Sequence, residues 1–275
     1  MLGGCSPSEV STPFSEPAAA IVDGHAISQK AYQQRLEVSR HRDPFLGIPE
    51  AAATPLPSQR LEDFTIEQLI HEELIRQEAQ RRGIAVSDQA VQSRIDSLRS
   101  RAGDSTFRGA LDRNGFTAES FKSYQRALLT EVALLDAIAK ERIHAAAQDL
   151  KNGQTFASVA ASWSDDSGTS ARGGEVGWLR PDDIPERPLA TAVQSLATGS
   201  DSGIVRTNRG FTIATVLERR SDQVHLAVIL TLAPTVDLLS PQGTPAWFTK
   251  FVADREAALQ RDGKLVVKVG SHAGG

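Results

Sequence analysis

The sequence is poor in the features that define several large classes of protein. It holds one cysteine, Cys5, among 275 residues, so no intramolecular disulfide can form. No apolar run reaches the roughly 18 residues that a membrane-spanning helix needs. The 30 Lys and Arg against 34 Asp and Glu give a net charge of −4, and there is no long basic block, which argues against nucleic acid as a partner.

Motifs for metal or nucleophilic chemistry are also missing. We find no Ser/His/Asp arrangement, no phosphate-binding glycine loop and no zinc motif. The sequence therefore predicts neither a metal nor a cofactor. The histidines without metal-ligand spacing are His25, His41, His71, His144 and His272.

The N-terminal residues suggest a lipid anchor. Leu2-Gly3-Gly4-Cys5 resembles the signal that precedes the lipidated cysteine of bacterial lipoproteins, and the alternative is an unmodified thiol. The residues that follow, "SPSEVSTPFSEPAAA", are rich in Pro, Ser and Glu, which predicts a disordered tether over 1–20. We expect a lipid at Cys5 to hold the protein on a membrane.

The first half of the chain has helical periodicity. After a short strand, an Asp-Gly turn and a return at "AAAIVDGHAIS", Ser28 is placed to cap a helix to Arg40, and a loop covers 42–60. Helices then begin at Leu61, Ser87 and Thr117. The last runs to Asn152-Gly153, or breaks near 140–144. The side chains expected to face inward include Tyr32, Leu36, Ile66, Leu69, Ile70, Leu74, Ile75, Val91, Ile95 and Leu98.

The second half has a different texture. Short helices, glycine turns and strands fill 154–220, and "GFTIATVLE" and "VHLAVILTL" are typical of two strands of a hairpin. An amphipathic helix at about 245–262 and a closing strand at 264–269 follow. Since a lone strand is not stable, we expect the closing strand to pair with the segment around 20–28.

Two parts of the chain resemble known families. "FASVAASWSDDSGTSARGGEVGWL" and "GFTIATVLERR" resemble the parvulin type of peptidyl-prolyl isomerase. Residues 21–144 resemble the helical chaperone lobe of SurA and PrsA, bacterial extracytoplasmic folding factors, notably in "LIHEELIRQEAQRRGIAVSDQAVQSRI". The resemblance implies an α+β protein in which 145–234 is parvulin-like. It also implies that 244–270 returns to pack on helices from 61–140.

The resemblance also implies a proline site. Asp166 is the counterpart of the acid that projects into that site, and the glycine-rich turn after it would let the backbone pass beneath a ligand. The alternative is that Asp165 or Asp166 merely bonds nearby amides in a turn. The resemblance implies that Val176, Ile184 and Leu189 are the three apolar residues that hold the proline, although they could equally be ordinary core. Phe211 and Val228 are further candidates for substrate contact.

Two departures weaken the implied activity. Active parvulins usually carry a histidine on the last strand, where this chain has Thr212, and we assign Thr212 beside Asp166 as the candidate catalytic pair. The second histidine sits on a first strand that is absent here. We infer that 224–232 takes that strand's place, as in a circular permutation, which puts Val228 at the histidine position. His225 would then face the other side of the sheet.

Three functions are open at this point. The first is a lipid-anchored chaperone of the bacterial cell envelope that binds unfolded or proline-containing polypeptide, with a weak or inactive isomerase domain. The second is a fully active isomerase that uses Asp166. The third is a structural envelope lipoprotein that binds one folded partner. A dimer is compatible with all three.

Overall fold

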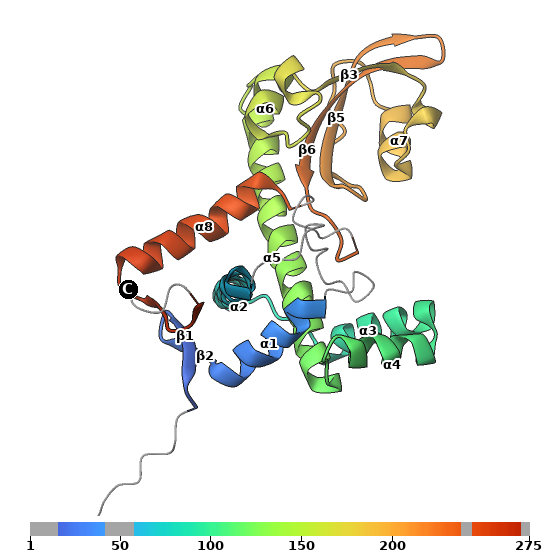
Figure 1. Cartoon of the computed structure of the whole chain (residues 1–275). Helices are drawn as coiled ribbons and strands as arrows, with labels where there is room; N and C mark the ends of the chain where they lie inside the picture. Colours follow the sequence, from blue (N-terminus) through green and yellow to red (C-terminus); the bar gives the residue numbers. More distant parts are fainter. Residues whose placement is uncertain (1–15, 42–57, 238–243, 271–275) are drawn as a thin grey trace, which may run out of the picture.

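The chain folds into a helical lobe and a sheet domain joined by one long helix. The computed structural model describes residues 16–41, 58–237 and 244–270, so the predicted lipidation site Cys5 lies outside the described residues. Helix α5 (Ala118–Lys151) runs from the helical lobe up to the sheet domain (Figure 1). The α+β class predicted from sequence is confirmed.

The predicted helices form in the helical lobe. The Ser28 hydroxyl accepts a hydrogen bond from the Ala31 amide at 3.1 Å, and the Ser87 hydroxyl accepts one from the Ala90 amide at 3.1 Å. These caps stabilise helix starts where backbone amides lack partners. One helix of this lobe, α4, was not foreseen. The helices of the lobe before α5 are α1 (Gln29–His41), α2 (Ser58–Arg81), α3 (Asp88–Ala102) and α4 (Asp104–Arg113).

Helix α5 is continuous, which decides between the two alternatives left open. A capping box of Thr117 and Ser120 starts it, and it runs without a break through residues 140–144 to Lys151. The boundary placed at residue 144 therefore falls inside a helix. Because a continuous helix is stiff, α5 fixes how far apart the helical lobe and the sheet domain lie.

A small sheet ties both chain ends of the described structure together. Strand β1 (Ala18–Val22) pairs antiparallel with β2 (His25–Ser28) and with β7 (Leu265–Val267), in the order β2-β1-β7. The predicted pairing of the closing strand is confirmed. Because β1 begins at Ala18, the expected tether over 1–20 extends three residues too far.

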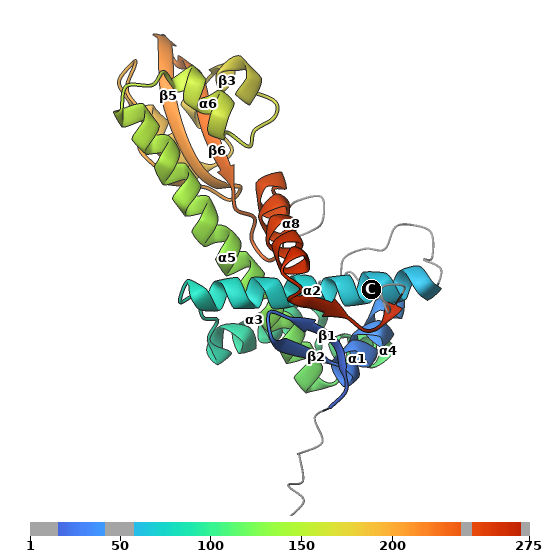
Figure 2. The same cartoon turned by 90° about the vertical axis from the view of Figure 1, so that its left-hand side faces the viewer.

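The last helix returns to the helical lobe as expected. Helix α8 (Ala246–Arg261) packs on α2 and leads into β7 (Figure 2). Phe248 on α8 is fully buried in a core that also contains Ile66 of α2 and Leu135 of α5. The C-terminal segment is thus part of the helical lobe's hydrophobic core.

The sheet domain confirms the predicted hairpin. Strand β5 (Gly210–Arg220) pairs antiparallel with β6 (Gln223–Leu232), and the turn between them has a positive φ of 49° at Ser221. The strands run further into the charged link than expected. The sheet order is β3-β6-β5-β4, so β6 is an internal strand; the outer strands are β3 (Glu175–Leu179) and β4 (Val205–Arg206).

The two faces of this sheet belong to different cores. Ile213 and Ile229 lie in the core shared with α5 and with α6 (Phe156–Trp163). Val216 and Leu226 lie in a second core with α7 (Arg187–Gln194). This division follows from the alternation of side chains along a strand.

Candidate functional site

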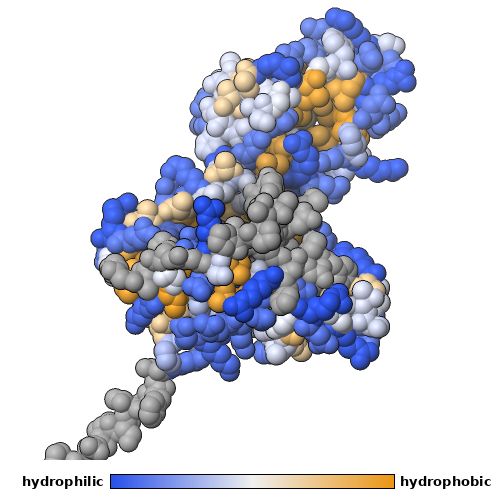
Figure 3. Space-filling model, in the orientation of Figure 1, coloured by the Kyte–Doolittle hydropathy of each residue, from blue (hydrophilic) through white to orange (hydrophobic). Residues whose placement is uncertain are grey.

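A pocket opens on the face of the sheet that α7 covers. It has a volume of about 280 Å³ and lies between β5 and β6, α7 and the turns around Asp166 and Pro185. Figure 3 shows an apolar depression in the sheet domain, rimmed by hydrophilic residues. The buried strand residues that form its floor are Thr212, Leu226, Val228 and Leu230.

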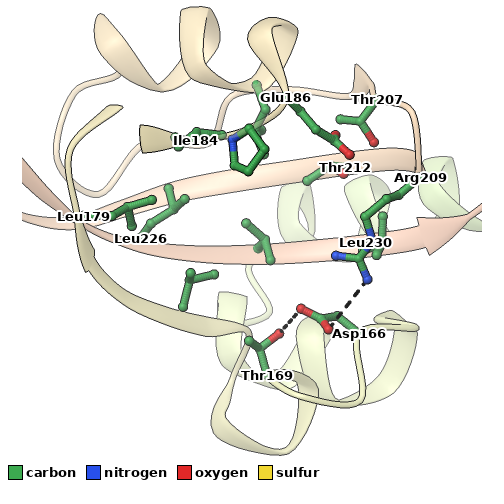
Figure 4. Close-up of a pocket in the computed structure, with 14 residues that line it drawn as sticks. Asp166, Thr169, Leu179, Ile184, Glu186, Thr207, Arg209, Thr212, Leu226 and Leu230 are labelled. Atoms are coloured by element: carbon green, nitrogen blue, oxygen red, sulfur yellow. Dashed lines mark hydrogen bonds and ion pairs between the residues drawn. The ribbon is translucent and has the colours of Figure 1, made fainter. Parts of the chain in front are cut away.

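Most of the residues singled out in the sequence meet in this pocket. Asp166 stands at one end and Thr212 and Val228 lie on the floor, as expected. Ile184 and Leu189 are 7% and 8% exposed, whereas Val176 is 45% exposed at the rim. The pocket therefore has an apolar half around Leu179, Ile184 and Leu226, and its polar side chains lie toward the other end, on both sides of the two strands (Figure 4).

The expectation for Phe211 is wrong. Its side chain packs in the core beneath the opposite face of the sheet, and the Arg206 guanidinium lies 4.7 Å from the centre of its ring. Thr212 is the next residue on the same strand and lines the pocket. Because neighbouring side chains on a strand point to opposite faces, Phe211 and Thr212 cannot both reach one ligand.

Asp166 both builds a turn and faces the pocket. Its carboxylate accepts a hydrogen bond from the Thr169 hydroxyl at 2.8 Å, and its carbonyl oxygen accepts one from the Ser170 amide at 2.8 Å. The other carboxylate oxygen lies 3.9 Å from an Arg209 guanidinium nitrogen across the pocket (Figure 4). The two readings of Asp166, as a turn residue and as a site residue, are therefore compatible.

The neighbouring Asp165 has a different role, because it connects three elements. Its carboxylate accepts hydrogen bonds from the Leu232 amide at 2.9 Å and from the Trp247 indole at 2.8 Å. Its other oxygen lies 3.6 Å from a guanidinium nitrogen of Arg142 on α5. Burial raises the pKa of Asp165, while these two hydrogen bonds and Arg142 oppose the rise.

Arg142 completes this junction by contacting aromatic rings. Its guanidinium carbon lies 5.5 Å from the Trp163 ring centre and 5.0 Å from the Trp247 ring centre, within the range of cation–π attraction. The Trp163 indole donates to the Asp149 carboxylate at 2.9 Å. The double aspartate thus combines a pocket residue with a residue that fastens the sheet domain to α5 and α8.

The glycine pair after the double aspartate is needed for a reason other than the expected one. Gly174 has a φ of +83°, and a Cβ there would lie 2.3 Å from the Val228 carbonyl oxygen. The Val228 amide donates to the Gly174 carbonyl at 2.8 Å. The side chain would therefore obstruct the backbone of β6 rather than a ligand.

The floor of the pocket has little hydrogen-bonding capacity. Val228 offers none, and the Thr212 hydroxyl makes no hydrogen bond with any residue that the structure describes. No histidine is among the residues that line this pocket. His225 faces away from it, stacks on Trp178 with the ring centres 5.0 Å apart, and lies 2.6 Å from Glu175.

The sequence interpretation missed two charged residues of the pocket, Glu186 and Arg209. Arg209 lies in a turn that the sequence predicted, just before β5. A turn involves only neighbouring residues, so it did not indicate that Arg209 would lie near Asp166. Glu186 lies two positions after Ile184, a predicted pocket residue, and this closeness in sequence was the one available sign that Glu186 lines the pocket. Thr169, Thr207 and Leu230 also line the pocket.

Two further features are absent from the described ranges of the chain. No cluster of three or more His, Cys, Asp or Glu side chains is arranged to hold a metal ion. None of the helices described combines the length and apolar character needed to cross a membrane.

Two family models match the chain in the order that the resemblance predicted. The SurA-like N-terminal domain matches residues 4–135, and the PPIC-type PPIASE domain matches residues 130–218. The protein thus contains two domains that match known families. It carries a SurA-like N-terminal domain followed by a parvulin-type peptidyl-prolyl isomerase domain. Strand β6 lies beyond the matched residues although it is internal to the sheet.

Two curated proteins, both named Chaperone SurA, are similar to this chain. The chain is 23% identical to the Chaperone SurA of Chromobacterium violaceum, over 76% of this chain and 58% of the relative. It is 27% identical to the Chaperone SurA of Pseudomonas aeruginosa, over 77% of this chain and 63% of the relative. The chain therefore spans about three fifths of these curated relatives. The crystal structure of the Foldase Protein (PrsA) from Lactococcus lactis aligns over 94% of this chain and 97% of the PrsA chain. The sequence identity is 16% and the TM-score is 0.35.

Proposed function

We propose that the protein is an extracytoplasmic chaperone that binds unfolded polypeptide and whose parvulin-type domain is weak or inactive as an isomerase. The observation that carries the proposal is the pocket, in which an apolar floor is retained while the floor's polar groups are reduced to one hydroxyl, that of Thr212. The match to the SurA-like N-terminal domain supports the chaperone part.

The chemistry of proline isomerisation explains why such a pocket would turn over slowly. The X-Pro bond must twist past a barrier of roughly 18–20 kcal/mol, and no bond to the substrate forms or breaks. A thousandfold acceleration needs about 4 kcal/mol of extra stabilisation of the twisted amide over the planar one. Leu226 and Val228 can hold a proline ring, but they stabilise both forms alike.

The proposal for location follows from the N-terminal residues and the class of the relatives. We propose that the protein acts in the bacterial cell envelope and that a lipid on Cys5 anchors it to a membrane. Mass spectrometry of the protein purified from membranes tests the anchor: a lipid mass on the Cys5 peptide is expected, and a Cys5→Ser variant should leave the membrane fraction.

Two assays run side by side test the main proposal. In a protease-coupled proline isomerisation assay, we expect activity well below that of a histidine-bearing parvulin measured beside it. In an aggregation assay with a chemically unfolded client, we expect the same sample to suppress aggregation. The double variant Thr212→His with Val228→His should raise the isomerisation rate, because it returns ring nitrogens to the floor of the pocket.

Other results would contradict the proposal. Full parvulin-like turnover by the natural chain, lost on Asp166→Ala, would establish a working isomerase. A chain that neither suppresses aggregation nor binds unfolded polypeptide would remove the chaperone function. The histidine variant needs circular dichroism and thermal melting alongside, so that a lost fold is not read as lost activity.

A further inference from the structure

Glu186 occupies an unusual position at the polar end of the pocket. It immediately precedes α7, where amides of the first helical turn lack backbone partners and a side chain can accept a hydrogen bond from one of them. Its side chain makes no such bond and instead lines the pocket, close to Thr207 and Thr212 (Figure 4). The Glu186 side chain therefore lines the cavity without a hydrogen bond to the helix that follows it.

The other charged groups of the pocket are engaged with each other. Asp166 is held by Thr169 and lies 3.9 Å from Arg209, so these two opposite charges offset one another. Among the charged residues described in the pocket wall, Glu186 is the one without a hydrogen bond or ion pair from its side chain. Its negative charge is left for whatever enters the pocket.

We propose that Glu186 determines specificity by selecting proline segments that carry a lysine or arginine next to the proline. This inference rests on the proposed function, because it assumes that the apolar half of the pocket takes the proline ring. An ionised carboxylate accepts hydrogen bonds and donates none, so a cationic side chain satisfies it best. The alkyl stem of Lys or Arg can lie along the apolar wall while its charge reaches Glu186.

The expected effect is small but measurable. Glu186 is half-buried, and ion pairs that remain in contact with solvent change affinity by about two- to fivefold. Salt screens them, so the selectivity should shrink as ionic strength rises. A preference that came from apolar contact alone would not fall with salt.

Methyl NMR of the whole chain with matched peptides tests the inference. Peptides with one proline carry Lys, Gln or Glu either directly before or directly after it. Shifts of the Ile184, Leu189 and Val228 methyl groups report occupancy of this pocket, separately from binding to the helical lobe. We expect the Lys peptide to bind about two- to fivefold tighter than the Gln peptide in at least one series, and the Glu peptide to bind more weakly.

Two variants make the test specific. Glu186→Gln keeps the size of the side chain and should abolish the preference for the Lys peptide over the Gln peptide. Asp182→Asn removes the same charge from an exposed residue nearby that does not line the pocket, and it should leave the preference intact.

The possible results are distinct. Methyl shifts without any charge preference would refute the role of Glu186 and leave the proposed function standing. Loss of the preference in Asp182→Asn as well as Glu186→Gln would refute it in favour of a general field. No methyl shift with any peptide would overturn both the inference and the proline site on which it rests.

Discussion

Replacing Asp165 by alanine should weaken the attachment of the sheet domain to the rest of the chain. The Asp165 carboxylate accepts from the Leu232 amide and from the Trp247 indole, and its side chain is 14% exposed. Leaving a buried donor without an acceptor costs about 1–3 kcal/mol. Asp165→Ala leaves two donors without an acceptor and removes the contact with Arg142. It also removes the cost of desolvating the carboxylate, so the net loss in the free energy of unfolding should be about 2–4 kcal/mol.

The adjacent Asp166 provides a matched control. Asp166→Ala removes one hydrogen bond from Thr169 and a contact of 3.9 Å with Arg209, whose side chain is 57% exposed. That loss should cost about 1 kcal/mol. Urea unfolding followed by far-UV circular dichroism should therefore rank Asp165→Ala as clearly more destabilising than Asp166→Ala. An equal or reversed order would refute the division of roles between the two aspartates.

A double-mutant cycle isolates the bond to α8. Trp247→Phe removes the indole donor while keeping an aromatic ring near Arg142, and alone it should cost about 1 kcal/mol. In the double variant with Asp165→Ala, the loss of stability should be smaller than the sum of the two single losses by about 1 kcal/mol, because each substitution removes the same hydrogen bond. Strict additivity would mean that this bond contributes nothing.

The pKa of Asp165 adds a test with a definite sign. Burial raises it above the ordinary carboxyl value of 3.8, so the folded state binds a proton that the unfolded state has already released. Stability from this group is therefore fully present below pH 3.8 and is lost as pH rises through the folded value. Asparagine does not titrate, so the cost of Asp165→Asn should be larger near pH 4 than at pH 7. A cost that grows with pH would contradict this reasoning.

Two further substitutions test the fold. Phe248→Ala empties a fully buried site between α8 and the helical lobe and should cost about 3–5 kcal/mol by urea unfolding, whereas Lys250→Ala, 74% exposed on the same helix, should change little. Equal effects would mean that α8 is not part of the core. Gly174→Ala should lower the melting temperature more than Gly177→Ala does: both have positive φ, but a Cβ at Gly177 meets nothing within 4 Å, whereas at Gly174 it meets the backbone of β6. Similar melting temperatures for these two variants would rule out that clash.

Much of the fold could be predicted because its causes are local. Helical periodicity predicted the buried apolar faces of α2 and α3. Ser28, Ser87 and Thr117 indicated where α1, α3 and α5 begin. The hairpin of β5 and β6 followed from two apolar runs joined by a polar link. The position of Asp166 beside an apolar pocket came from the family resemblance, which carries information on long-range contacts that periodicity lacks.

The sequence by itself therefore determined the helices, the hairpin and the apolar positions, since each depends on residues within a few positions of one another. Tertiary structure alone decided which face of β5 meets the pocket, and so placed Thr212 there and Phe211 in the opposite core. It also assigned Asp165 to the junction, because Trp247 lies 82 residues away along the chain. The same holds for Glu186, because whether its side chain finds a hydrogen-bonding or ion-pair partner depends on which side chains surround it in three dimensions.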